Sequence, residues 1–220
     1  MHGRHRIVTF HGLGTPPRWV EGSEQTVWVD RDLFEATLDE AARLGDDVAI
    51  TFDDGNRSDV EIALPALRER RLKGTFFVVA ERIGDPRYLG ADDLRELVAA
   101  GMGVGSHGLE HRSWRTLDDE LLKTHLERAR SMLEETTGSP VTEASCPFGE
   151  YDRRVLGHLR RSGHERVYTS DGGPTSRDGW LQARTTVGSD WGPPAACLVR
   201  EDAPTERLLR VAKRTVKRWR

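Results

Sequence analysis

Acidic and imidazole side chains occur at two places where the sequence predicts that a strand ends. Asp53 and Asp54 directly follow the apolar run 48–52, and the carboxyl ends of parallel strands open into the ligand crevice of α/β folds. His107 and His111 lie four residues apart after a glycine-rich segment, so on a helix they would share one face. One carboxylate and two neutral imidazoles form the ligand set of an open zinc site, which keeps a position for water. The combination predicts metal-assisted hydrolysis.

Each pair also has a simpler interpretation. Asp-Asp-Gly is an ordinary turn sequence, and two histidines at this spacing also occur on protein surfaces or in cores. The metal-site interpretation therefore depends on the two pairs together. Both pairs follow predicted strands that should open on the same rim.

The elements that must position these residues alternate between strand and helix. The strands are expected at 6–10, 48–52, 75–79, 102–105, 141–146, 166–169 and 181–187. The helices are expected at 30–45, 58–67, 92–99, 117–135, 153–161 and 204–220. Ser58 and Glu61 have the spacing of a capping box for the second helix. The alternation predicts an α/β fold with a parallel sheet or barrel.

Length and composition narrow the function classes. A chain of 220 residues and 24.8 kDa fits one domain over 1–220. The 33 basic and 36 acidic residues give a net charge of -3, so a nucleic-acid partner is not expected. Hydrophobic content is 36% and mean hydropathy is -0.60. No apolar run approaches the roughly 20 residues that a membrane span needs.

The N-terminal residues and the cysteines bear on cellular location. Residues 1–6 are basic and lack the apolar stretch of a secretory signal, which predicts a cytoplasmic protein unless the native chain begins earlier. Cys146 and Cys197 show no paired metal spacing. We expect both to be free thiols in a reducing compartment.

The C-terminal segment 204–220 places leucine, valine and tryptophan among many arginines and lysines. The pattern predicts a basic amphipathic helix that packs on the domain or extends from it. Such a helix can also lie on an anionic membrane. Packing on the domain with a solvated basic outer face is the preferred interpretation.

Four segments together carry a family resemblance. They are Thr-Phe-Asp-Asp-Gly at 51–55, Gly-Thr-Phe-Phe-Val at 74–78, Ser-His-Gly-Leu-Glu-His at 106–111 and Pro-Phe-Gly at 147–149. In type, order and spacing they resemble the signature of NodB-type polysaccharide deacetylases, over roughly residues 6–190. The resemblance implies a single distorted (β/α) barrel, often seven-stranded, that removes acetyl groups from N-acetylated sugars with the help of a metal.

The resemblance also implies roles for the two residue pairs. Carried over by position, Asp53 is the general base, while Asp54, His107 and His111 bind a divalent metal. Zinc suits one carboxylate and two imidazoles, although other divalent ions tolerate the same ligands. A bound cation would also relieve the repulsion between two adjacent acids.

The fourth motif is implied to stabilise the tetrahedral oxyanion. The resemblance assigns this task to the backbone N–H of Phe148. Pro147 fixes the chain before it, and Gly149 lets the backbone turn after it, so that the amide can point at the substrate. Taken alone, the tripeptide is an ordinary turn.

Two departures from the family pattern stand out. Members often carry an arginine shortly before this proline that holds the catalytic aspartate, and residues 143–146 contain none. Arg184, on the last predicted strand, is our candidate to replace it, with a surface arginine as the alternative.

The second departure is a missing histidine. Many members end with a strand and a histidine that protonates the leaving amine, but the last histidine here is His164. His11, after the first predicted strand, is our candidate to contact the substrate and donate this proton. Asp171 is the counterpart of the acid that tunes the missing histidine.

The sequence therefore predicts a metal-dependent hydrolase that deacetylates an N-acetylated sugar or glycan. Two alternatives remain open. The same site could hydrolyse sugar acetyl esters or small ureido or amide compounds. The two departures also leave room for a catalytically weak barrel that binds glycan or metal. The glycan and the oligomeric state are not predicted.

Overall fold

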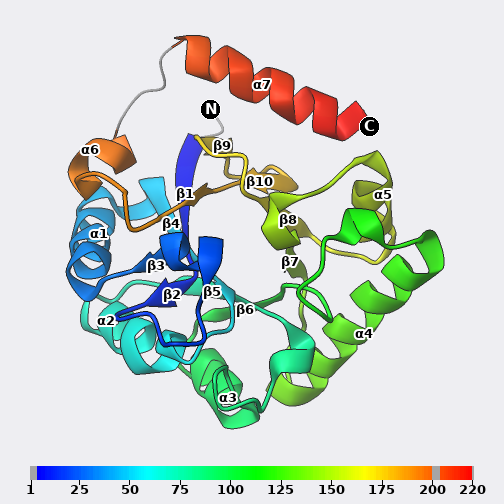
Figure 1. Cartoon of the computed structure of the whole chain (residues 1–220), viewed down its shortest axis with the longest axis horizontal. Coiled ribbons are helices and arrows are strands. Elements are labelled where there is room, and N and C mark those ends of the chain that lie inside the picture. The colour runs from blue at the N-terminus through cyan, green and yellow to red at the C-terminus, as the bar shows by residue number, and fades with distance from the viewer. Residues whose placement is uncertain (1–3, 200–203, 220) are drawn as a thin grey trace.

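The computed structural model describes residues 4–199 and 204–219, and its centre is a nearly closed parallel barrel. The strand order is β10-β8-β7-β6-β5-β4-β1-β11. The strands are β1 (Arg4–Phe10), β4 (Val48–Asp54), β5 (Gly74–Val78), β6 (Gly103–Ser106), β7 (Glu143–Ser145), β8 (Arg166–Thr169), β10 (Leu181–Ala183) and β11 (Thr185–Thr186). Figure 1 shows the helices arranged around these strands.

Barrel closure depends on the last predicted strand, 181–187. Its first part, β10, pairs in parallel with β8, and its second part, β11, pairs in parallel with β1. The switch occurs at Arg184, whose N–H donates to the carbonyl of Thr169. Counted as one interrupted strand, β10 and β11 complete a barrel of seven parallel strands among the described residues. The predicted distorted β/α barrel is confirmed.

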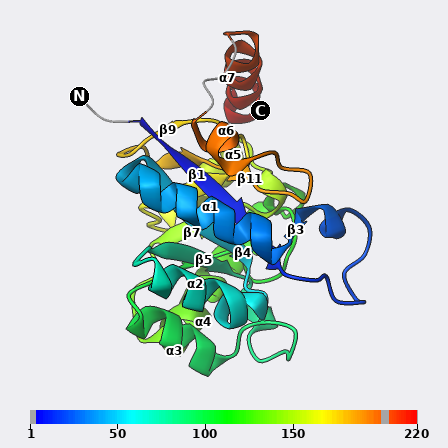
Figure 2. The ribbon, with the colours of Figure 1, turned by 90° about the vertical axis from the view of Figure 1, so that its left-hand side faces the viewer.

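Helices cover the outside of the barrel (Figures 1 and 2). They are α1 (Arg31–Leu44), α2 (Leu64–Glu69), α3 (Ala91–Ala99), α4 (Asp119–Thr137), α5 (Arg153–Arg161), α6 (Pro194–Val199) and α7 (Pro204–Trp219). Asp30, Asp118 and Asp152 cap α1, α4 and α5 by accepting a backbone N–H of the first turn. None of the helices in the described ranges has both the length and the apolar character of a membrane span.

Short elements complete the architecture. Strand β9 (Thr175–Ser176) pairs antiparallel with the start of β1. Strands β2 (Gly12–Leu13) and β3 (Trp28–Val29) form a separate pair in the loop after β1. Single helical turns cover Gly22–Val27, Gly45–Asp47, Ala80–Arg82, Trp114–Thr116 and Pro147–Gly149.

Alternation along β1 and β4 divides the side chains between two layers. Phe10 and Phe52 are buried, and the ring of Phe10 meets that of Phe34 of α1 edge-on, with centroids 5.0 Å apart. Because successive strand residues point to opposite faces, Thr51 and Asp53 point into the barrel. Burial of each aromatic side chain contributes about 1.5–3 kcal/mol. The packing of Phe10 and Phe52 against α1 on the outer face of the barrel therefore keeps Asp53 on its inner face.

The start of the second helix differs from its prediction. A π-helical turn over Asp59–Ala63 precedes α2, and Ser58 makes no side-chain cap. The Ser58 hydroxyl instead accepts the N–H of Leu13, at 3.2 Å. The capping-box prediction was wrong because this hydroxyl binds the loop after β1. Glu61 pairs with Arg57.

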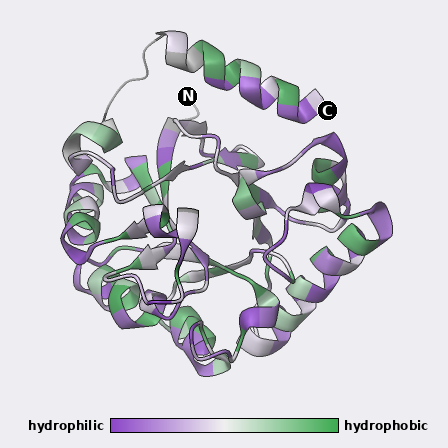
Figure 3. Ribbon diagram, in the orientation of Figure 1, coloured by the Kyte–Doolittle hydropathy of each residue, from purple (hydrophilic) through white to green (hydrophobic). Residues whose placement is uncertain are grey.

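Helix α7 also differs from its prediction. Its apolar side chains are exposed, whereas Arg214 and Lys217 are turned toward the barrel. The exposed apolar residues are Leu208, Leu209, Val211, Val216 and Trp219. Apolar and basic residues alternate along the helix in Figure 3. The surface below α7 offers polar acceptors, including the Gly172 carbonyl and Asp171, which explains why the basic side faces inward.

Candidate active site

The two aspartates end β4 in different conformations. Asp53 is in the strand, with 2% of its surface exposed. Asp54 has a φ of 80°, and Gly55, with a φ of 69°, continues the sharp turn out of the barrel. A non-glycine residue held at positive φ costs about 1–3 kcal/mol and is concentrated at functional sites. The two adjacent carboxylates therefore point to different surroundings.

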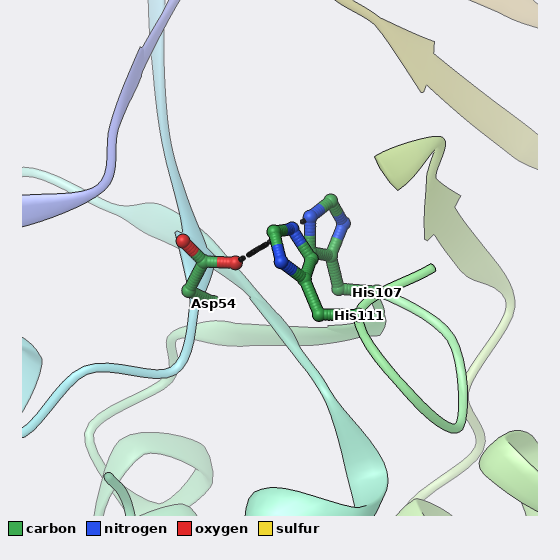
Figure 4. A group of neighbouring side chains, drawn as sticks. All are labelled: Asp54, His107 and His111. Carbon is green, nitrogen blue, oxygen red and sulfur yellow. Dashed lines mark ion pairs between the residues drawn. The ribbon is translucent and has the colours of Figure 1, made fainter. Parts of the chain in front are cut away.

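Asp54 points at the two imidazoles (Figure 4). Its Oδ1 lies 3.2 Å from Nε2 of His111 and 3.7 Å from Nε2 of His107. These three side chains form a group whose ligand atoms all lie within 4.8 Å of one another. Among the described residues, the buried Oδ1 of Asp54 forms no hydrogen bond, although nitrogens of His111 and Arg82 lie within 3.5 Å of it. The carboxylate of Asp54 and the imidazoles of His107 and His111 therefore point toward a common position.

The carbonyl of Ser145 fixes the orientation of the first imidazole. Nδ1 of His107 lies 3.0 Å from this carbonyl oxygen. Because a carbonyl only accepts, Nδ1 carries the proton and Nε2 presents its lone pair to Asp54. Burial lowers the pKa of His107 to about 4, so the ring is neutral at neutral pH. Burial also lowers the pKa of His111.

The donor set fits a divalent cation. Bonds of about 2.0–2.1 Å at tetrahedral angles would place the donor atoms about 3.3 Å apart. The distances from Asp54 Oδ1 to His111 and His107, 3.2 and 3.7 Å, bracket this value. A fourth protein donor is not found among the described residues, so a bound cation would keep a position for water or substrate.

Asp53 is held by Arg184 through a bidentate ion pair. The guanidinium donates to Oδ1 at 2.7 Å and to Oδ2 at 2.6 Å. Arg184 is fully buried, so the alternative of a surface arginine was wrong. Burial opposes ionisation of Asp53, but the charge and hydrogen bonds of Arg184, together with the charges of His107 and His11, outweigh burial and hold the pKa of Asp53 well below its usual range. Asp53 is therefore a carboxylate at neutral pH.

Further contacts hold the guanidinium in place. Arg184 donates to the hydroxyl groups of Thr9, Thr51 and Ser145 at 3.1, 3.2 and 2.6 Å. Ser145 in turn donates to Asp53, at 3.1 Å. A planar guanidinium with several fixed donors suits such a site better than a lysine. The network joins β1, β4, β7 and the switch between β10 and β11.

The Pro147–Gly149 turn presents the proposed oxyanion donor. Phe148 has a φ of 58° and its side chain is 62% exposed. Within the described ranges, the Phe148 N–H has no hydrogen-bond acceptor. Its ring centroid lies 4.4 Å from that of His111. The turn therefore packs the Phe148 ring against His111, a candidate metal ligand, and leaves the Phe148 amide unpaired.

Gly149 is required by its surroundings. Its φ is 62°, and a Cβ added there would lie 2.7 Å from Cβ of Ser170. Gly149→Ala should lower the free energy of unfolding by about 1–3 kcal/mol, because both the backbone and this contact would be strained. Urea denaturation measures the change. Gly138→Ala is the matched control for positive φ, since a Cβ at Gly138 meets nothing within 4 Å. A smaller loss for Gly149→Ala than for Gly138→Ala would contradict the contact argument.

His11 lies beside Asp54. Together with Asp54, Arg82 and Tyr88 it lines a small cavity of about 20 Å³. Arg82 approaches Asp54 Oδ1 at 3.5 Å and lies over the ring of Tyr88, 4.4 Å from its centroid. Burial opposes ionisation of Asp54, but His11, the other imidazoles and Arg82 together lower its pKa. Trp19 also borders the cavity.

A much larger cavity, of about 780 Å³, lies elsewhere, between α5, the β8–β10 region and α7. None of the metal-site residues lines it. Its size therefore does not identify the reaction centre. The chemistry of the side chains makes the rim where Asp54, His107 and His111 meet the candidate reaction centre.

The profile of the family described as polysaccharide deacetylase matches residues 41–167. The chain belongs to the polysaccharide deacetylase family. This match covers the metal set, Asp53 and the Pro147–Gly149 turn. Among individual proteins, YxkH of Bacillus subtilis (strain 168), named for the same family, is 26% identical over 136 residues. That match covers 62% of this chain and 49% of YxkH, so the chain spans about half the length of this curated relative.

Solved structures of deacetylases share the fold. PplD of Streptococcus pyogenes, solved in complex with acetate, is 17% identical, with a TM-score of 0.80 over 92% of this chain and 100% of PplD. The polysaccharide deacetylase BC0361 of Bacillus cereus is 18% identical, with a TM-score of 0.76 over 88% of this chain and 67% of BC0361. IcaB of Ammonifex degensii is 21% identical, with a TM-score of 0.73 over 83% of this chain and 91% of IcaB.

The sequence anticipated part of this candidate site. The helical premise for His107 and His111 was wrong, because residues 107–113 form a loop, in which Gly108 has a φ of 90°. The loop still brings both rings together, with centroids 5.3 Å apart. Ser145 and Arg82 were missed. The predicted strand ran one residue past Ser145, and Arg82 lies in the turn Ala80–Arg82 after β5, so their contacts with Asp53 and Asp54 follow from the fold and not from the sequence pattern.

Proposed function

We propose that this chain is a metal-dependent hydrolase that removes N-acetyl groups from an acetylated sugar or polysaccharide. The observation that supports this most is the division between two adjacent carboxylates. Asp54 faces two imidazoles, whereas Asp53 is bound by Arg184. The names of the relatives supply the substrate class, since YxkH and BC0361 are both named as polysaccharide deacetylases.

Zinc is the metal that we propose for Asp54, His107 and His111. When bound, the cation would polarise the acetyl carbonyl and lower the pKa of a water towards about 7. Asp53 is then suited to accept the proton of the attacking water. Its low pKa makes it a weak base, so it needs a water whose own acidity has been raised. The proposed role of Asp53 as a base therefore depends on the metal that Asp54 would help to bind.

Two further groups complete the proposed site. The Phe148 N–H is placed to donate to the carbonyl oxygen as negative charge develops there. His11 borders the cavity beside Asp54 and is our candidate to contact the substrate and protonate the leaving amine. Pro147 and Gly149 shape the turn that carries Phe148.

Acetate release from a substrate panel tests the proposed function. The metal-loaded protein should release acetate from N-acetylchitooligosaccharides faster than from an O-acetylated xylan, even though an ester is intrinsically easier to hydrolyse than an amide, because the proposed substrate is an N-acetylated glycan. Faster release from the ester, or ammonia release from a small ureido compound, would favour the alternative hydrolase activities. A tightly bound metal without acetate release from any acetylated glycan would contradict the proposal.

A further inference from the structure

Lys217 connects the C-terminal helix α7 to the Pro147–Gly149 turn, which carries the proposed oxyanion donor. The side chain reaches from α7 to the carbonyl oxygen of Gly149, with Nζ at 3.0 Å. The same Nζ lies 2.7 Å from Oδ1 of Asp171. Lys217 therefore joins three segments that are far apart in the sequence: α7, the Pro147–Gly149 turn and the loop after β8.

Asp171 is built into this connection from several sides. Its Oδ2 accepts from the hydroxyl of Tyr151 at 2.7 Å and from Thr169 at 3.0 Å. Its side chain is 3% exposed, and that of Lys217 is 26% exposed. Burial opposes ionisation of Asp171, but the bonds from Lys217 and Tyr151 hold its pKa below the usual range. The carboxylate is a fixed, charged anchor for Lys217.

Few hydrogen bonds hold the turn that Lys217 contacts. Within it, Gly149 donates to Cys146 at 2.9 Å and Glu150 donates to Pro147 at 3.1 Å. Among the described residues, Lys217 is the one side chain that forms a hydrogen bond with the backbone of residues 147–149. Phe148 has the unfavourable φ of 58°, so the turn needs outside contacts to keep this conformation.

We propose that Lys217 is a positioning residue that holds the Phe148 N–H in its oxyanion-binding orientation. Helix α7 is thereby part of the active site, and Lys217 is the partner of Asp171, which in the family resemblance pairs with a histidine. The kinetic part of this inference rests on the proposed deacetylase function. The structural part does not, because the hydrogen bond to Gly149 restrains the turn whatever the substrate.

Lys217→Met should lower kcat by about 10- to 100-fold with little change in KM or metal content. Removal of an oxyanion donor costs about 10²–10³ in kcat, and a donor that is present but displaced costs less. Lys213→Met is the matched control. It removes the same charge from an exposed position one turn earlier on α7 and should leave kcat within about twofold.

Hydrogen–deuterium exchange gives a measurement that does not need activity. Peptides covering residues 146–150 should exchange at least about fivefold faster in Lys217→Met than in wild type or Lys213→Met. Asp171→Asn, which weakens the anchor but keeps the lysine, should show a smaller increase at the same peptides. The metal-set peptides around residues 107–111 should be unchanged, which distinguishes local loosening of the turn from unfolding.

The outcomes separate this inference from the proposed function. Unchanged exchange at residues 146–150 in Lys217→Met would overturn the positioning role, even if the wild type deacetylates glycans. Faster exchange in an enzyme without acetate release would retain the restraint and contradict the deacetylase function. Equal loss of kcat in Lys217→Met and Lys213→Met would also overturn the inference, because it would show a general effect of charge on α7.

Discussion

Arg184→Met is expected to lower the free energy of unfolding by about 3–5 kcal/mol at pH 7. This is the usual cost of removing one partner of a buried ion pair, because the remaining charge is buried without compensation. Both partners are almost completely buried here, with exposed side-chain fractions of 0% and 3%. Three hydroxyl groups, of Thr9, Thr51 and Ser145, also lose their donor.

The pH dependence of this loss has a defined sign. In the wild type, Arg184 lowers the folded-state pKa of Asp53, so this stabilisation is present above the unfolded pKa of about 3.9 and is lost as pH falls below it. Without Arg184, burial raises the folded-state pKa instead. The difference in stability between wild type and variant should therefore be largest near neutral pH and shrink as pH falls toward about 4.

Urea denaturation of both proteins at pH 7 and near pH 4.5 measures this difference. Arg161→Met is the matched control, because Arg161 is exposed on α5 and should change stability by less than about 0.5 kcal/mol. The double variant Arg184→Met/Asp53→Asn should recover part of the loss, since no buried charge remains. A loss below about 1 kcal/mol for Arg184→Met, or one that grows as pH falls, would contradict the role of this ion pair.

Asp54→Ala is expected to weaken metal binding by at least about 100-fold and to remove detectable turnover. Loss of an outer partner of a metal ligand costs about 10–100-fold, and a direct ligand should cost more. Asp54 supplies the carboxylate of the three-donor set. Isothermal titration with zinc, followed by acetate release at saturating zinc, measures both effects.

Glu110→Ala is the control for this substitution. Glu110 lies between the two histidines in the sequence, but its side chain pairs with Arg112 and is not in the donor set. Metal affinity should stay within about twofold of wild type in this control. Full metal affinity in Asp54→Ala would show that the ligand assignment is wrong.

Strands such as β1, β4 and β5 could be predicted because each is a short apolar or β-branched run followed by a loop. The strand 181–187 was predicted as one element, and the structure interrupts it at Arg184, where it changes neighbours. Sequence periodicity carries no information about such a change of partner. Arg184 could be proposed as the partner of Asp53 only because the usual arginine is missing from residues 143–146 and Arg184 lies on the last predicted strand.

Other features depend on contacts between distant segments. The inward basic side of α7 is set by acceptors at Gly149, Asp171 and Gly172, and the helix pattern alone favoured apolar packing. The hydroxyl of Ser58 had a local capping role available, but it binds Leu13 instead. The role of Ser145, which contacts Asp53 and orients His107, likewise appears only once β7 lies beside β6.

The most direct test of the central claim is acetate release from N-acetylchitooligosaccharides by zinc-loaded wild type and zinc-loaded Asp53→Asn. Both proteins should contain the same amount of zinc, since Asp53 is outside the donor set. The account predicts about 10²–10⁴-fold lower kcat in Asp53→Asn, the usual contribution of a general base, and loss of wild-type activity after chelation that zinc restores. Equal turnover by the two zinc-loaded proteins, or undiminished wild-type turnover after chelation, would contradict it.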